Sequence, residues 1–409
     1  DYTPYLYKTE DYGKKWTLIT NGIKDNYYTR VIRTDQKRKG LLYAGTEWGM
    51  YVSFDDGTSW NPFQLNLPVT AIRDLQVRDN DLIVATHGRS FWIIDDLTPL
   101  HQLTKDIVNT DLHLYKPDAS YRMHQSGGWS KPDPKLVGEN HPDGVIINYY
   151  VKSFTVSDTV QLDILDKNGN LIQRFSTSAK ENKLNPAAPK PLSVTSGGNR
   201  LVSTMRYAGF KTLDGMIYCS SPNIVPKTVT GIYKVKLTVN GVSKEQEFKI
   251  VKDPRLSNSQ KDYNDQFDFL IAVRNQVSRA NEGIVKIRTI QKDLKYLNEK
   301  TKDNSEFQKL IAAYETELSS IENNIHMTKN QSRQDPLNYG IRINNRLAFL
   351  MADSQRGDYP PTQQAKQFFK EASQELQEQI SALDALIETQ TKIINEKVAL
   401  EDIKMISGE

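Results

Sequence analysis

Two copies of one eight-residue pattern constrain what the first hundred residues of this chain can fold into. Residues 9–16 (TEDYGKKW) and 53–60 (SFDDGTSW) both read Ser/Thr-x-Asp-x-Gly-x-x-Trp, and a degenerate third copy keeps Asp95 without the glycine and the tryptophan. The aspartates Asp11, Asp55 and Asp95 are 44 and then 40 residues apart. Repeats of this length are typical of the four-stranded sheets of a β-propeller, which are called blades.

Each residue type of the pattern has a physical role in a turn between two strands. The aspartate carboxylate accepts hydrogen bonds from backbone N–H groups of the turn, and the glycine adopts a backbone angle that is costly for other residues. The tryptophan packs between sheets. We assign these structural roles to Thr9, Asp11, Gly13, Trp16, Ser53, Asp55, Gly57, Trp60 and Asp95. Because the turn occupies the carboxylate, we expect no catalytic role for these aspartates.

The pattern is the Asp-box, or BNR, signature and resembles that of sialidase-like and sortilin-like β-propellers. The whole chain resembles the C-terminal part of large Bacteroidetes proteins that are labelled glycosyl hydrolase, BNR-repeat or sortilin-N-terminal-domain proteins. This resemblance is carried by residues 44–47, 53–57, 66–68, 81–82, 85–89, 91–96, 198–200, 206–207, 253–255 and 335–339. It implies an exported protein of the periplasm, the cell surface or the medium, whose signal peptide would lie upstream.

The repeats predict the last two to three blades of a propeller in residues 1–104. A ring needs typically about four or more blades, so we expect upstream blades of the same protein to complete it. Strands are expected at residues 29–34, 41–45, 50–53 and 60–64 in one repeat, and at 72–77, 81–85, 91–95 and 101–103 in the next.

Four polar or aromatic residues occupy equivalent turns of successive repeats. Glu47 and Trp48 fall on one turn, and His87 and Arg89 fall on the next. Two interpretations remain open, since these side chains can complete the turns and pack the blades or can form the rim of a ligand surface. The adjacent carboxylates at residues 95–96 do not fit glycoside hydrolysis, because adjacent strand residues point to opposite faces.

The composition changes along the chain and predicts separate domains. Residues 105–142 read as a linker, residues 143–252 as a β-sandwich with Asn-Gly hairpins at 168–169 and 240–241, and residues 257–409 as helices. The sandwich resembles the Ig-like fold of flagellar hook-cap proteins and bacterial sorting domains, which implies a spacer or a docking surface.

Apolar residues spaced three and four apart predict an antiparallel helical bundle at the C-terminal end. Helices are expected at residues 259–300 and 304–327, from Asp335 and Pro336 through Leu350, and from about Phe369 to Ile394, with breaks at 357 and 360–361. The apolar stripes either cover one another or bind a partner helix, and internal packing is favoured because several striped helices are available.

The charge and ligand inventory excludes several classes of function. With 53 basic and 50 acidic side chains, the chain gives no electrostatic case for nucleic acid or for an anionic membrane. The single cysteine, Cys219, forms no intrachain disulfide, and the six histidines show no zinc spacing, so no metal site and no cofactor are expected. No apolar run is long enough to span a membrane.

Three functions remain open from the sequence. The first is an extracytoplasmic propeller without catalytic activity in this stretch, which binds a protein or a glycan or acts as a scaffold. The second is a sialidase-like or related glycoside hydrolase whose catalytic carboxylates lie in upstream blades. The third is an accessory subunit of an outer-membrane or secretion complex. The arginine triad, tyrosine and acidic partners that a sialidase needs are not identifiable in this sequence.

Overall fold

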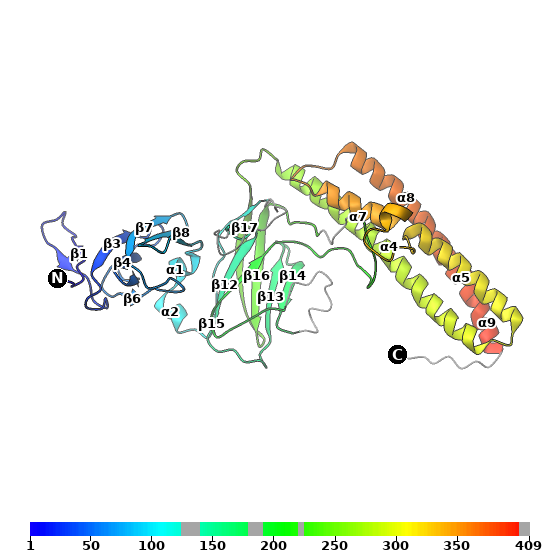
Figure 1. Cartoon of the computed structure of the whole chain (residues 1–409), viewed down its shortest axis with the longest axis horizontal. Helices are drawn as coiled ribbons and strands as arrows, with labels where there is room; N and C mark the ends of the chain where they lie inside the picture. Colours follow the sequence, from blue (N-terminus) through cyan, green and yellow to red (C-terminus); the bar gives the residue numbers. More distant parts are fainter. Residues whose placement is uncertain (124–139, 179–190, 220–224, 401–409) are drawn as a thin grey trace.

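The chain folds into sheets at its N-terminal end and helices at its C-terminal end. The computed structural model describes residues 1–123, 140–178, 191–219 and 225–400. Figure 1 shows three parts in succession: small sheets, a pair of larger sheets, and a group of long helices. The protein is therefore multidomain, with a sheet-rich part followed by a helical part, as the sequence predicted.

The N-terminal part contains three antiparallel sheets in sequence order. Strands β1 (Tyr7–Lys8) and β2 (Thr17–Leu18) form the first sheet. The second has the order β3 (Thr29–Thr34), β4 (Leu42–Thr46), β5 (Gly49–Ser53) and β6 (Asn61–Pro62), and the third has β7 (Ile72–Arg78), β8 (Asp81–Thr86) and β9 (Phe91–Ile94). These strands lie close to the expected ranges, although β6 is shorter than expected.

The three sheets stack face to face because their strands alternate between two apolar faces. On one face of the second sheet, Leu42 and Tyr51 pack with Leu6 and Ile23 of the first repeat. On its other face, Tyr43 packs with residues of the third sheet. The contact is close at Gly45 of β4, where an added Cβ would lie 2.6 Å from a methyl carbon of Ile72 on β7.

The prediction of a strand at residues 101–103 is wrong. Helix α1 (Thr98–Gln102) occupies this place, so the third sheet has three strands where the second has four. Pro99 lies in the first turn, which suits a helix start and cannot donate to a strand ladder. Leu97 is fully buried, and the His101 ring contacts the Asp35 carboxylate at 3.0 Å, so tertiary contacts hold the turn.

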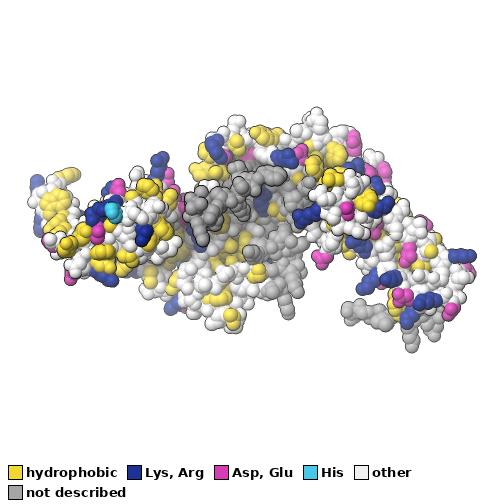
Figure 2. Space-filling model, in the orientation of Figure 1, with side chains coloured by type: hydrophobic (Ala, Val, Ile, Leu, Met, Phe, Trp, Pro, Cys, Tyr) yellow, Lys and Arg dark blue, Asp and Glu magenta, His cyan; other side chains and the backbone are white. Residues whose placement is uncertain are grey.

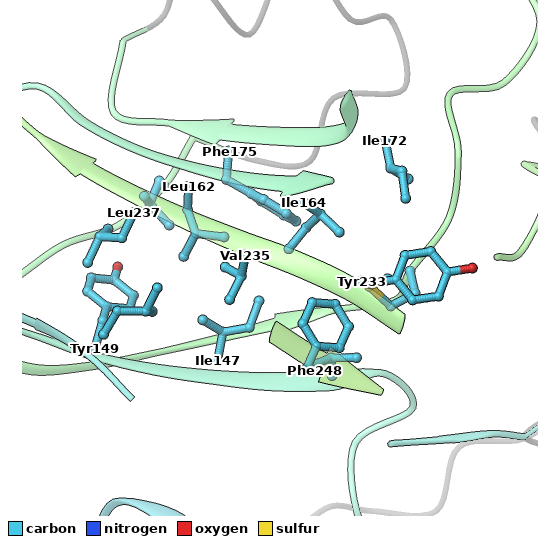
Figure 3. Packing of buried hydrophobic residues seen from close by; sticks show 14 of the residues in the cluster. Ile147, Tyr149, Leu162, Ile164, Ile172, Phe175, Tyr233, Val235, Leu237 and Phe248 are labelled. Carbon is cyan, nitrogen blue, oxygen red and sulfur yellow. The ribbon is translucent and has the colours of Figure 1, made fainter. Parts of the chain in front are cut away.

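The middle part consists of two sheets packed face to face. One has the order β10 (Leu112–Leu114), β12 (Val145–Val151), β15 (Gly197–Ser203); the other has β11 (Ser120–Arg122), β17 (Val242–Lys252), β16 (Gly231–Val239), β13 (Val160–Leu165), β14 (Leu171–Ser176). Figure 3 shows Ile147 and Tyr149 of β12 facing Leu162, Val235 and Leu237 of the larger sheet.

The range predicted as a linker contributes structure to this part. After the short helix α2 (Lys105–Val108), β10 and β11 add an edge strand to each sheet. β11 pairs with β17 in parallel, whereas the other strand pairs of the two sheets are antiparallel. The Pro- and Gly-rich stretch that follows β11 lies mostly outside the described residues.

The helical part is built on a helix of 41 residues, α4 (Gln260–Lys300). Its start is a capping box in which Ser259 and Asp262 satisfy each other's backbone N–H groups. The remaining helices are α5 (Ser305–Ile325), α6 (Pro336–Tyr339), α7 (Ile343–Ser354), α8 (Gln363–Leu386), the π-helical turn η1 (Ile387–Thr391) and α9 (Lys392–Leu400). Apolar residues of α4, α5, α7 and α8 share one core, so the stripes do cover one another.

The helix expected from Asp335 through Leu350 is interrupted. Gly340 ends α6 with a φ of 75°, a left-handed conformation that glycine adopts without strain, and α7 begins three residues later. The start signal at Asp335 is visible in the sequence, whereas the stop at Gly340 was not predicted.

A buried cation joins the middle part to the helical part. The Arg122 side chain at the end of β11 is 2% exposed and donates to the Asp358 carboxylate, whose side chain is 0% exposed, in the loop before α8. It also donates to the Thr228 carbonyl oxygen at 2.8 Å and lies over the Tyr263 ring of α4 at 5.1 Å. Burial lowers the pKa of the guanidinium to about 10.

Candidate functional site

The aspartates of the two full sequence patterns are held inside their turns. The Asp11 carboxylate accepts a hydrogen bond from the Lys15 backbone N–H at 2.8 Å, and Asp55 accepts one from Ser59 at the same distance. The bond from Lys15 lowers the pKa of Asp11. Burial raises the pKa of Asp55, but the bonds from Ser59 and neighbouring groups outweigh it and lower the pKa overall.

Among the other members of the two patterns, the hydroxyl groups bond to the turns in the same way, whereas the tryptophans differ in exposure. The hydroxyl groups of Thr9 and Ser53 accept bonds from the backbone N–H of Gly13 and Gly57, at 2.8 and 2.9 Å. Trp60 is 3% exposed, and its indole N–H donates to the Ile19 carbonyl oxygen at 2.7 Å.

Trp16, the corresponding residue of the first pattern, is 57% exposed. It belongs to an uncovered apolar face of the first sheet. Tyr7 of β1 is opposite Leu18 of β2, and Tyr5 and Trp16 each lie two residues from one member of that pair, so the four share a face. All four side chains are about half exposed or more.

The third copy has a different environment. Asp95 lies 3.3 Å from the Arg200 guanidinium of β15, and the Asp96 carboxylate accepts bonds from Asn148 at 2.7 Å and from the Thr98 backbone N–H at 3.0 Å. These two carboxylates connect the third sheet to the middle part.

The two turns that hold Glu47, Trp48, His87 and Arg89 have the same local geometry. The Thr46 hydroxyl donates to the Gly49 carbonyl oxygen at 2.8 Å and accepts from the Trp48 backbone N–H. In the same way, the Thr86 hydroxyl donates to the Ser90 carbonyl oxygen at 2.6 Å and accepts from the backbone N–H of the residue before Ser90. The contact between Gly45 and β7 places both turns at the same end of adjacent sheets.

The side chains on these two turns present aromatic and charged groups together. Trp48 is 48% exposed. The neighbouring Glu47 carboxylate is paired with the Arg30 guanidinium, which lies over the Tyr28 ring at 4.9 Å. On the second turn, the His87 ring is in contact with the Arg73 guanidinium, with the nitrogens 3.0 Å apart, and the Arg89 side chain is exposed. Tyr28, Arg30 and Arg73 are not among the residues predicted from the sequence.

An acidic cavity of about 500 Å³ lies where the third sheet meets the middle part. Its lining includes the carboxyl groups of Asp79, Asp81, Asp95, Asp96, Asp118 and Asp143, together with Lys37 and His141. Burial, and then the neighbouring carboxylates, raise the pKa of Asp81 despite the opposing effect of His141. No spacing signal could have revealed this cavity, because its residues come from segments that only the tertiary fold brings together.

The described residues show neither a metal-binding cluster nor a helix able to cross a bilayer. Among them, no three His, Cys, Asp or Glu side chains are arranged to hold a metal ion. Within the same ranges, no helix combines the length and the apolar character needed to span a membrane.

Comparisons with known proteins yield no assignment to a family. No family model matches the sequence, and no curated protein does. Two similar solved structures are extracellular domains from B. thetaiotaomicron, one of a putative one component system and one of a putative hybrid two component system. Each is 9% identical; the TM-scores are 0.19 and 0.21, over 61% and 62% of this chain. The chain spans 28% and 29% of those chains, and at these values the likeness carries no inference about fold or function.

Proposed function

We propose that this protein is an extracytoplasmic binding or scaffolding protein, without catalytic activity in this stretch, whose ligand is a protein or a glycan. In this proposal, the N-terminal sheets are blades of an Asp-box β-propeller. The middle part is an Ig-like sandwich, and the helical part is an antiparallel bundle. The sandwich and the bundle serve as spacer or docking modules.

Uncovered apolar faces at both ends of the stack of sheets support the propeller. The first sheet exposes Tyr5, Tyr7 and Leu18 on the side away from the second sheet. At the other end of the stack, Phe91 and Ile93 of β9 are 76% and 61% exposed. Since the second sheet buries both of its faces against its neighbours, we propose that upstream blades of the same protein cover these faces as well.

The rim, formed by Glu47, Trp48, His87 and Arg89, is the feature that supports the binding role. Trp48 offers a half-exposed aromatic surface beside the Arg30–Glu47 ion pair, and the adjacent turn adds His87 and Arg89. An aromatic surface packs against the apolar face of a sugar ring or a side chain, while the charged groups bond to hydroxyl or amide groups. Such a combination suits recognition of a glycan or a peptide.

The experiment is a binding screen of the chain against glycan and peptide panels, followed by titration of the ligands retained. We expect Trp48→Ala to weaken binding by about tenfold, as for a central aromatic contact. Tyr339→Ala, which removes an aromatic group with the same exposed fraction of 48% on the helical part, serves as the matched control. A ligand that Trp48→Ala and Arg89→Ala both retain at full affinity would disprove the proposal that the rim binds it. Turnover of a glycan by this chain would contradict the proposal that this stretch has no catalytic activity.

A further inference from the structure

The segment between α5 and α7 exposes apolar side chains from a tight turn. Leu337, Tyr339 and Ile341 are 77%, 48% and 39% exposed, whereas Pro336 is buried and fixes the turn to the helices. Three large apolar residues within five positions are unusual on a soluble surface that has no partner.

Internal hydrogen bonds hold this segment in shape. The Asp335 carboxylate accepts bonds from the backbone N–H groups of Gln331 and Ser332 at 2.6 and 2.8 Å, and from the Ser332 hydroxyl at 3.0 Å. The Tyr339 backbone N–H donates to the Asp335 carbonyl oxygen at 3.0 Å. The exposed apolar side chains are therefore presented by an ordered turn.

The same segment carries an excess of positive charge. Between residues 327 and 342, the cations are Lys329, Arg333 and Arg342, and Asp335 is the sole acid. The Asp335 carboxylate is already engaged by the turn, and the Lys329 ammonium lies over the Tyr339 ring at 5.9 Å. Figure 2 shows hydrophobic side chains among both basic and acidic side chains on the helical part, so the excess of positive charge is a property of this segment. The near-neutral total charge of the chain conceals this local imbalance.

We propose that this turn docks the protein on the surface of an anionic membrane, with Leu337, Tyr339 and Ile341 in the interface and the flanking cations on lipid phosphates. Apolar and aromatic side chains combined with Lys and Arg are typical of interfacial membrane contacts. This inference goes beyond the proposed function and is independent of the rim.

The shape of the turn favours a membrane over an acidic protein. Residues two positions apart on a helical turn point about 200° apart, so Leu337 and Tyr339 flank a ridge and share no flat face. A rigid protein surface would cover one side of that ridge, whereas the headgroup region of a bilayer adapts to both sides.

The test is sedimentation of the 409-residue chain with vesicles. The vesicles contain phosphatidylcholine alone or a mixture with phosphatidylglycerol. We expect binding to the mixed vesicles that falls as salt rises. Each cation near an anionic surface is worth about fivefold in partitioning, so the double variant K329E/R333E is expected to bind at least about 25-fold more weakly. The triple variant L337S/Y339S/I341S is expected to lose about tenfold or more.

Matched variants elsewhere on the chain separate this turn from general surface effects. K292E/K295E makes the same charge change on exposed positions of α4, and Val156→Ser removes an apolar side chain that is fully exposed in a loop of the middle part. Both are expected to bind vesicles as the unchanged chain does, and so is Trp48→Ala. No binding to the mixed vesicles, or equal loss in the matched variants, would overturn the proposal. Capture of an acidic protein without vesicle binding would overturn it as well.

Discussion

Removal of one partner of the buried Arg122–Asp358 pair is expected to destabilise the helical part strongly. Both side chains are almost completely excluded from solvent. In the variant Asp358→Ala, the guanidinium keeps its bond to the Thr228 carbonyl oxygen and its contact with the Tyr263 ring, but loses its counter-ion. Breaking a buried pair from one side costs about 3–5 kcal/mol, because an uncompensated charge remains buried.

The magnitude can be measured because the chain separates its spectroscopic signals. Trp16, Trp48, Trp60 and Trp92, four of the five tryptophans, belong to the N-terminal part, whereas the long helices follow residue 259. Tryptophan fluorescence therefore follows mainly the N-terminal part, and circular dichroism at 222 nm follows the helical part. If the free energy of unfolding falls by about 2 kcal/mol per M of urea, the midpoint of the helical transition should fall by about 1.5–2.5 M. The midpoint of the fluorescence transition should remain unchanged.

Two further variants test the reasoning rather than the size of the effect. Replacement of both partners, as Arg122→Met with Asp358→Leu, removes the charge together with its counter-ion and should recover most of the stability. Lys261→Ala breaks an exposed pair with Asp265 on α4 and should change the free energy of unfolding by about 0.5 kcal/mol or less. If Asp358→Ala behaves like Lys261→Ala, the buried pair does not stabilise the contact between the two parts.

Three smaller perturbations address the stack of sheets and the helical core. Gly45→Ala forces a side chain into the close contact between β4 and β7 and should cost about 1–3 kcal/mol in the fluorescence transition; Gly198→Ala, where an added Cβ meets no atom within 4 Å, should have little effect. Asp55→Ala leaves turn N–H groups without their acceptor and should cost about 1–3 kcal/mol in the same transition. His326 is 5% exposed, and its pKa is lowered chiefly by burial, so the folded helical part favours the neutral ring. As pH falls below about 6.5 towards the lowered folded pKa, the unfolded chain binds the proton first and stability should fall, and His326→Gln should flatten this dependence.

Each of these expectations has a clear contrary result. Equal midpoints for Gly45→Ala and Gly198→Ala would mean that the two sheets are not in close contact at β4. An unchanged fluorescence midpoint in Asp55→Ala would show that the hydrogen bonds of the Asp55 carboxylate do not contribute to stability. A pH dependence of the helical transition that persists in His326→Gln would assign it to other groups.

Local chemistry made part of this fold predictable from the sequence. The turn at Asp55 and the start of α4 at Ser259 depend on side chains that bond to backbone groups a few residues away, and such spacing is visible in the sequence. The prediction of a strand at residues 101–103 was wrong because the burial of Leu97 and the contact of His101 with Asp35 depend on residues distant in sequence.

The candidate sites divide in the same way. Glu47, Trp48, His87 and Arg89 could be placed on equivalent turns because the repeats align without a gap. The acidic cavity could not be foreseen, since its aspartates come from the third sheet and from segments beside β11 and β12. The exposure of the apolar residues that follow Pro336 could not be predicted for a different reason, because the helix predicted there assigns apolar residues to a core.

The length of α4 gives the joint at its base a mechanical consequence. A helix of 41 residues at 1.5 Å per residue extends about 60 Å, and the Arg122 contact lies near its first turns. A rotation of about 10° at that joint displaces the far end of the helix by about 10 Å. The buried ion pair, together with neighbouring contacts such as that of Tyr207 with Phe267, thus helps to set where the distant end of α4 points, and a substitution at the joint is expected to change the reach of the protein as well as its stability.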